Sequence, residues 1–250
     1  MPRFHTHIGI DYSGAATPET RLPGIRISTA RGGAVSPGNG AANWSRRAAA
    51  EWLLEALQKT GPAIVGIDHG FSFPLAWFDA HGVEKNWGAF LAAFCSACPA
   101  NRPGSRVDGF LGQAQILRGN ARWRRRTEIR CGAKSVFHFG VPGSVAKSTH
   151  AGIPWLDFLR RELGAKIHFW PFDGFGVPPG KHVAAEVYPS LWRRGTAPRG
   201  TSPDAYDAWT AARALFEADA TGAIGSMLQP ELPEADMLAA QAEGWILGVR

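Results

Sequence analysis

Two segments far apart in the sequence each end in an aspartate after a run of strand-forming residues. Residues 8–11 read IGID and residues 65–68 read VGID, and small residues follow both segments. Such short apolar runs are typical of β-strands that stop near the aspartate. Because binding sites in open α/β sheets form at the carboxyl ends of strands, we expect Asp11 and Asp68 to lie at one edge of a sheet.

Three further acids are candidates for the same edge. Glu186 lies inside the apolar segment 182–188, where a charge is costly unless it is paired or bound to a cation. Asp204 and Asp207 are three residues apart in a helix that we expect to begin at Ser202-Pro203, a cap residue followed by proline. The apolar stripe of this helix continues on the side of the two acids, so they face the core rather than solvent.

Carboxylates gathered at one place repel each other, and divalent cations resolve this repulsion. Two Mg²⁺ or Mn²⁺ ions roughly 3.5–4 Å apart can activate a water and stabilise the leaving oxygen of a phosphodiester. Mg²⁺ prefers oxygen ligands, which suits a site made of carboxylates. Each acid alone has a simpler interpretation as a turn or helix cap, and Glu186 could pair with an arginine.

The elements that must position these acids follow a pattern of strands and helices. Strands are expected at residues 5–11, 24–30, 63–68, 166–170 and 182–188, and helices at 44–60 and from 202 onward. The strand at 63–68 is apolar on both faces and therefore belongs in a sheet covered on both sides. Glycine-rich residues 32–40 are expected to form a loop. The predicted class is α/β, a mixed central sheet flanked by helices.

Composition limits the remaining classes. The chain has 250 residues, a net charge of +6, 10 tryptophans and 14 phenylalanines, too many large side chains for a disordered protein. We expect one domain over residues 1–250, with a helical and loop insertion at 79–150 that carries few strand signals. Three cysteines, no apolar leader and no apolar run long enough for a bilayer favour a cytoplasmic location.

The order of these elements resembles the ribonuclease-H-like fold, in particular its Holliday-junction resolvases, whose last helix carries an acid, two other residues, then Asp-Ala. The whole chain is similar to the family called domain of unknown function 429, described as predicted nucleases of this fold. The segments that carry the resemblance are IGIDYSG (8–14), VGIDHGFSFP (65–74), WRRRTE (123–128), WPFD (170–173), AEVYPSLW (185–192) and EGWILG (243–248).

The resemblance implies a set of metal-binding and catalytic residues. Asp11, Asp68, Glu186 and Asp207 would hold Mg²⁺ or Mn²⁺, and Asp204 would assist. The chain departs from the pattern in two places. Glycine-rich residues 32–40 replace part of the third edge strand, and the insertion 79–150 has no equivalent in the minimal fold.

Other residues are candidates for substrate contact. Arg124, Arg125 and Arg126 lie beside Trp123, and arginines mixed with an aromatic suit phosphate contact and base stacking. The alternative is an ordinary solvated basic face. We also expect Ser13 and His69, which follow the two strand ends, to contact substrate. The partner would then be nucleic acid.

The cysteines offer a different interpretation. Cys95 and Cys98 have a spacing seen in zinc sites, with Cys131 and His138 as possible further ligands. A second close pair is missing, so we favour free thiols.

Three functions remain open. The first is a metal-dependent nuclease. The second is an actin-like phosphotransferase, because DxxG at residues 11–14 and DxG at 68–70 resemble phosphate loops of that superfamily. The third is a non-catalytic protein of the same fold that binds nucleic acid through its basic surface, with affinity that falls as salt rises.

Overall fold

The computed structural model describes residues 2–37, 43–196 and 201–250. The strands are β1 (Thr6–Asp11), β2 (Arg26–Arg31), β3 (Ala34–Pro37), β4 (Ala63–Asp68), β5 (Ile167–Phe169) and β6 (His182–Glu186). The α-helices are α1 (Arg46–Lys59), α2 (Leu75–His81), α3 (Trp87–Ala97), α4 (Val107–Leu111), α5 (Arg126–Cys131), α6 (Ala146–Leu163), α7 (Pro203–Ala220), α8 (Ile224–Leu228) and α9 (Glu234–Glu243). Short 3₁₀ turns are η2 (Gln115–Leu117), η3 (Gly164–Lys166) and η4 (Pro189–Leu191).

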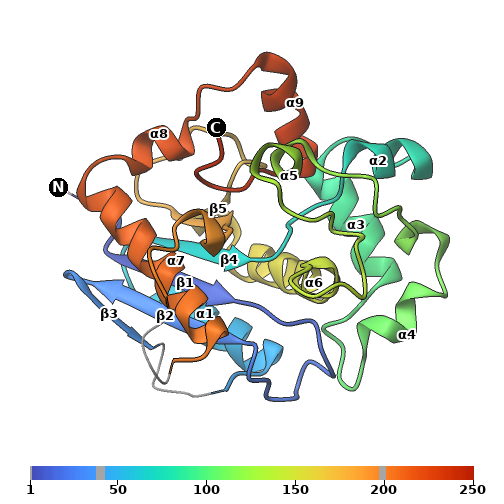
Figure 1. Ribbon diagram of the computed structural model, residues 1–250, viewed down its shortest axis with the longest axis horizontal. Helices are drawn as coiled ribbons and strands as arrows, with labels where there is room; N and C mark the ends of the chain where they lie inside the picture. The colour runs from blue at the N-terminus through green and yellow to red at the C-terminus, as the bar shows by residue number, and fades with distance from the viewer. Residues whose placement is uncertain (1, 38–42, 197–200) are drawn as a thin grey trace.

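The strands form one six-stranded mixed sheet in the order β3-β2-β1-β4-β6-β5 (Figure 1). The first three strands pair antiparallel, whereas β1, β4, β6 and β5 are parallel to one another. The predicted α/β class with a mixed sheet between helices is therefore confirmed.

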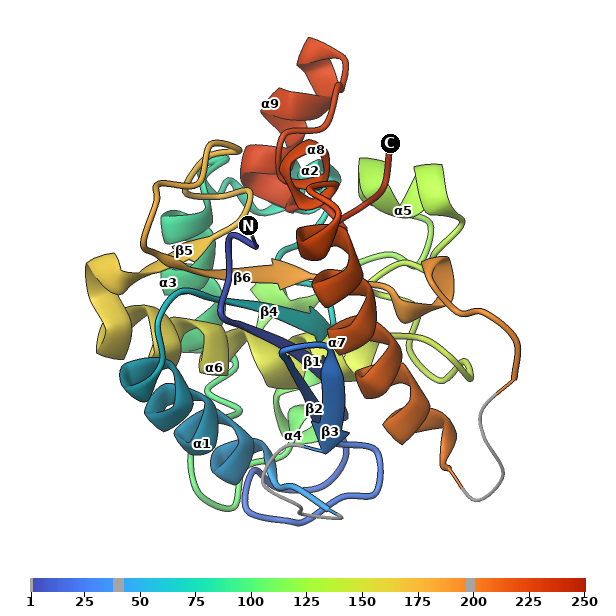
Figure 2. The ribbon, with the colours of Figure 1, turned by 90° about the vertical axis from the view of Figure 1, so that its left-hand side faces the viewer.

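Helices cover both faces of this sheet, with α1 and α6 on one side and α7 on the other (Figure 2). Alternate residues of the central strands divide between the two layers, as the two-residue period of a strand requires. Ile8, Ile10 and Ile67 belong to the core beneath α1 and α6. Ile64 and Ala185 belong to the core beneath α7.

The sequence analysis located five of the six strands described here and the helices α1 and α7. The strand ends at Asp11 and Asp68 and the start of α7 are confirmed, and the Ser202 hydroxyl accepts the Ala205 N–H at 3.2 Å as a helix cap. The helix predicted at 44–60 begins later than expected. Ser45 caps α1, so the helix starts at Arg46.

The glycine-rich segment differs from the prediction. Ala34–Pro37 form the edge strand β3, which pairs with β2. Gly32 and Gly33, with φ of +55° and +91°, make the two-residue turn between the strands. Two adjacent residues with positive φ are the geometry of a tight β-hairpin, so this glycine pair signals a hairpin rather than an open loop. The rest of the predicted loop, residues 38–40, lies outside the described residues.

The segment 79–150 contains helices and loops and no strand, as expected. Its last helix, α6, does not stop at residue 150 but continues to Leu163 beneath the sheet. Within the described ranges, no helix is both long enough and apolar enough to cross a membrane.

Candidate metal centre

Three of the predicted acids meet at the edge of the sheet where β1 and β4 end. Asp11, Asp68 and Asp207 each offer a carboxylate oxygen, and these oxygens lie within 4.8 Å of one another. We call these three residues the acidic trio. Asp11 and Asp68 are register partners on parallel strands, so their side chains leave the same face of the sheet. Among the described residues, this is the one group of three or more potential metal ligands.

The third acid reaches the trio because α7 packs very close to β1. A Cβ placed on Gly9 would lie 2.2 Å from the carbonyl oxygen of Ala208, far inside contact distance. Only glycine allows the helix backbone to approach the strand in this way. Asp207 directly precedes Ala208. The absence of a side chain at Gly9 therefore lets the Asp207 carboxylate come close to Asp11. Gly66 occupies the same position in VGID (65–68) as Gly9 in IGID (8–11), and it leaves room for the side chains of Val187 and Leu215.

The trio is electrostatically strained without a cation. Burial, together with the charges of Asp68, Asp204 and Asp207, raises the pKa of Asp11 to about 9. Burial and the charges of Asp207 and Glu186 raise the pKa of Asp68 to about 8. Both carboxyls therefore hold a proton at neutral pH in the metal-free protein, and the arrangement favours a cation that replaces these protons.

Arg193 is the residue that the sequence analysis missed. Its Nε donates to Asp207 Oδ1 at 2.7 Å, and a second guanidinium nitrogen donates to Oδ2. Its charge lowers the pKa of Asp11 and Asp68, opposing the effect of burial. Arg193 lies in the irregular segment after η4, where no periodic pattern predicts which way a side chain points.

Glu186 does not join the trio, contrary to the prediction. It is the register partner of Ile67, one residue before Asp68, so alternation sends its side chain to the opposite face of the sheet. There the guanidinium of Arg125 donates to both of its oxygens, at 2.6 Å each. The alternative of a carboxylate paired with an arginine is therefore the one that the geometry supports.

The arginines expected to hold phosphates all contact other parts of the protein. Arg125 is 0% exposed and also donates to Glu128 at 2.9 Å. Arg124 donates to the backbone carbonyls of Glu128 and Ala133, and Arg126 pairs with Asp236 at 2.6 Å. Arg125 and Arg126 thus tie this segment to β6 and α9, and Arg124 holds it together locally, which corrects the prediction that the three arginines contact substrate phosphates.

His69 also differs from its predicted role. It is 1% exposed, and its Nδ1 is 2.9 Å from the Gly70 carbonyl oxygen. Burial lowers its pKa to about 4, so the ring is neutral and is held inside the protein rather than offered to a substrate. Ser13 is half-buried just beyond Asp11. Asp204 lies in the first turn of α7, outside the trio but near enough to raise the pKa of Asp11.

The cysteines are free. Burial raises the pKa of Cys95 and Cys98 to about 12, so both remain protonated thiols at neutral pH. This agrees with the favoured interpretation.

Comparisons with known proteins add no assignment to this site. A scan against models of protein families, a search of curated proteins and a search of solved structures each gave no match. Any function for the site must therefore be argued from its own geometry.

Proposed function

We propose that this protein is a metal-dependent nuclease of the ribonuclease-H-like fold. The observation that carries the proposal is the approach of the Asp11, Asp68 and Asp207 oxygens to within 4.8 Å of one another. Three carboxylates from two strand ends and one helix make an oxygen-only donor set, as Mg²⁺ and Mn²⁺ prefer. The strand order, with an antiparallel hairpin series followed by parallel strands, supports the choice of fold.

In this proposal the acidic trio, Arg193 and Asp204 have different roles. The trio would hold the ion, which supplies activation of a water and stabilisation of the leaving oxygen of a phosphodiester. Arg193 would orient Asp207 through its two donated hydrogen bonds and place a positive charge beside an incoming phosphate. Asp204 would contribute negative charge from the first turn of α7.

Two measurements test the proposal together. Mn²⁺ and Mg²⁺ should raise the melting temperature of the wild type, and Mn²⁺ should support cleavage of at least one labelled single-stranded, duplex or branched substrate. Asp207→Asn should lose both effects. Asp157→Asn is the matched control, because Asp157 pairs with Arg161 on α6 and lies outside the trio. A wild type that shows neither divalent stabilisation nor cleavage would refute the proposal.

A second candidate is a non-catalytic nucleic-acid-binding protein. The Arg193–Asp207 ion pair favours it, because a guanidinium can neutralise one of the trio's charges without a metal. In that case nucleic acid would bind equally well with Mn²⁺ or with a chelator, and Asp207→Asn would leave binding unchanged.

A further inference from the structure

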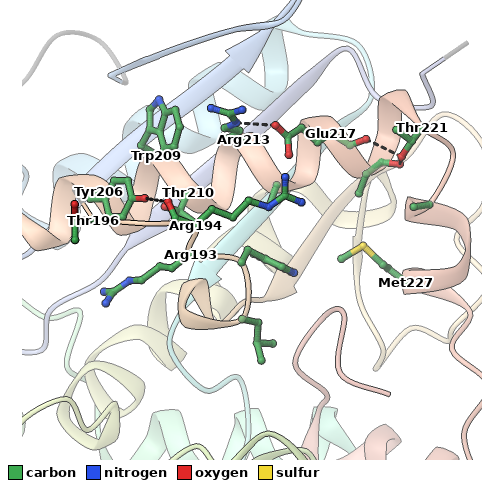
Figure 3. Close-up of a pocket in the computed structure, with 15 residues that line it drawn as sticks. Arg193, Arg194, Thr196, Tyr206, Trp209, Thr210, Arg213, Glu217, Thr221 and Met227 are labelled. Carbon is green, nitrogen blue, oxygen red and sulfur yellow. Dashed lines mark hydrogen bonds and ion pairs between the residues drawn. The ribbon is translucent and has the colours of Figure 1, made fainter. Parts of the chain in front are cut away.

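A groove of about 800 Å³ runs along the outer side of α7 (Figure 3). One wall is a face of α7, and the other is the segment 191–196 that follows β6. The helix contributes Tyr206, Thr210, Arg213, Glu217 and Thr221, at the spacing of three or four residues that defines one helical face. The face from residue 206 to 221 is about 22 Å long, from a rise of about 1.5 Å per residue.

The groove carries an excess of positive charge. Arg193 and Arg194 line one wall and Arg213 the other, with the single carboxylate of Glu217, and the Arg193 side chain points away from that of Arg194 (Figure 3). Arg213 is paired with Glu217 at 2.6 Å, and Arg193 with Asp207. Arg194 forms no ion pair with any residue in the described ranges. Its backbone carbonyl accepts the Tyr206 hydroxyl at 3.0 Å, which fastens this wall to the helix.

Aromatic rings lie among these charges. Trp209 is half-buried and stacks on Tyr206, with ring centroids 5.9 Å apart and planes 13° apart. The guanidinium carbon of Arg213 lies 5.0 Å from the Trp209 ring centroid. Trp192 lines the opposite wall. Indole rings beside guanidiniums are the combination that holds single strands, because unpaired bases stack on the rings while the arginines contact phosphates. A duplex offers no free base face to the rings, since its bases already stack on one another.

Arg193 links the groove to the acidic trio. It lines one end of the groove and donates to Asp207, which directly follows Tyr206 in the helix. A strand lying along α7 would therefore bring a phosphate to the edge of the sheet where the trio lies.

We propose that this groove binds a single-stranded polynucleotide, with Arg194 and Arg213 at its phosphates and Trp209 against a base. The assignment of this strand as the substrate rests on the proposed nuclease function, whereas binding itself does not. The groove replaces the segment 124–126 as the nucleic-acid contact surface, because Arg125 is buried with its partners, whereas the Arg213–Glu217 pair is exposed and Arg194 has no ion-pair partner among the described residues.

The test measures binding without metal. Fluorescein-labelled 15-mers of deoxythymidine and of uridine are titrated with the full chain in a chelator, and the anisotropy is followed beside a labelled duplex. We expect one or both single strands to bind more tightly than the duplex. For two phosphate contacts, the affinity should fall about sevenfold between 50 and 200 mM salt. Preference for DNA or RNA is read from the two single-strand arms.

Variants locate the binding surface. Trp209→Ala should weaken binding at least about fivefold, and Arg194→Gln should weaken it and reduce the salt dependence. Arg122→Gln is the matched control, an equal charge change at an exposed position in the segment 118–126. Since Arg194 is exposed, its variant is expected to fold even if Trp209→Ala does not.

The outcomes separate this proposal from the nuclease proposal. No single-strand binding, tighter duplex binding, or loss of binding in Arg122→Gln with none in Arg194→Gln would overturn the groove. If the wild type responds to Mn²⁺ and the groove variants bind single strands as tightly as the wild type, the metal-centre proposal stands and the groove proposal is rejected. Groove-dependent binding without any Mn²⁺ response or cleavage rejects the nuclease and retains the groove.

Discussion

Asp68 and Glu186 end neighbouring parallel strands, yet their carboxylates have different partners on opposite faces of the sheet. Asp68 lies within the trio, whereas both oxygens of Glu186 accept hydrogen bonds from Arg125. One acid is surrounded by like charges, and the other is matched by a buried cation. The same change from carboxylate to amide should therefore have opposite effects on stability at the two positions.

Glu186→Gln should destabilise the protein by about 3 kcal/mol or more, because it leaves the buried Arg125 without its main counter-charge. Urea denaturation followed by fluorescence measures this. Glu217→Gln, which breaks the exposed pair with Arg213, is the control and should change the free energy of unfolding by less than about 1 kcal/mol. Equal effects of the two variants would contradict the structural role given to Glu186.

Asp11→Asn should raise the melting temperature of the metal-free protein at pH 8. The pKa of Asp11 is about 9 in the folded protein against an ordinary value of 3.8, so the folded state binds more protons than the unfolded state between these values. Stability contributed by this group therefore falls as pH rises from about 4 to 9. Asparagine does not titrate and removes this loss. A lower melting temperature at pH 8, with Mn²⁺ stabilisation retained, would contradict the model of a strained trio.

Affinity for Mn²⁺ should increase with pH up to about 9. The pKa values of about 8 for Asp68 and about 9 for Asp11 mean that the ion must displace protons at neutral pH. Each released proton contributes about a tenfold gain in affinity per pH unit below its pKa. Calorimetry in two buffers of different ionisation enthalpy counts the protons. Binding without proton release at pH 7 would show that the carboxylates are already ionised.

Arg193→Gln should strengthen Mn²⁺ binding, because it removes a positive charge from the trio and frees both oxygens of Asp207. The same variant should lower the stability of the metal-free protein, since the trio loses its counter-charge. Arg194→Gln is the control for an equal charge change at the next residue, which has no contact with Asp207. If both variants change the affinity equally, the effect is one of overall charge rather than of the ion pair.

Gly9→Ala should separate α7 from β1. The added Cβ would lie 2.2 Å from the Ala208 carbonyl oxygen, and overpacking of this kind costs about 1–3 kcal/mol. Asp207 should then move away from Asp11, so the Mn²⁺ response should weaken with stability. Gly109→Ala is the control, because a Cβ at this position in α4 meets nothing within 4 Å. An unchanged Mn²⁺ response in a destabilised Gly9→Ala would exclude this glycine as a positioning residue.

Local sequence patterns were enough to predict the strand or helix on which each member of the trio lies. The strand ends at Asp11 and Asp68 and the capped start of α7 depend on neighbouring residues alone. Glu186 was misplaced because its face depends on the register of β6 against β4, which no pattern within residues 182–188 contains. Gly9 and Gly66 are visible in the sequence and indicate that another element packs closely against each strand. The sequence alone does not identify that element.

The arginines show that the sequence also does not reveal contacts between residues far apart in the chain. Arg125 and Arg126 read as part of a free basic surface because their partners Glu186, Asp236 and Glu243 lie far along the chain. For Arg193 the error was the opposite, because the sequence analysis did not identify it as part of the site. Nothing in its surroundings in the sequence marks it, and only the return of α7 beside the segment 191–196 brings it to Asp207.

A single rigid helix, α7, bears Asp207 on one side and Trp209 two residues later on another. The distance between a bound ion and a base stacked on that indole is thus set by the geometry of the helix rather than by a loop. In the proposed nuclease, cleavage would therefore occur at a constant number of nucleotides from the base that stacks on Trp209. This number would not depend on the sequence of the strand.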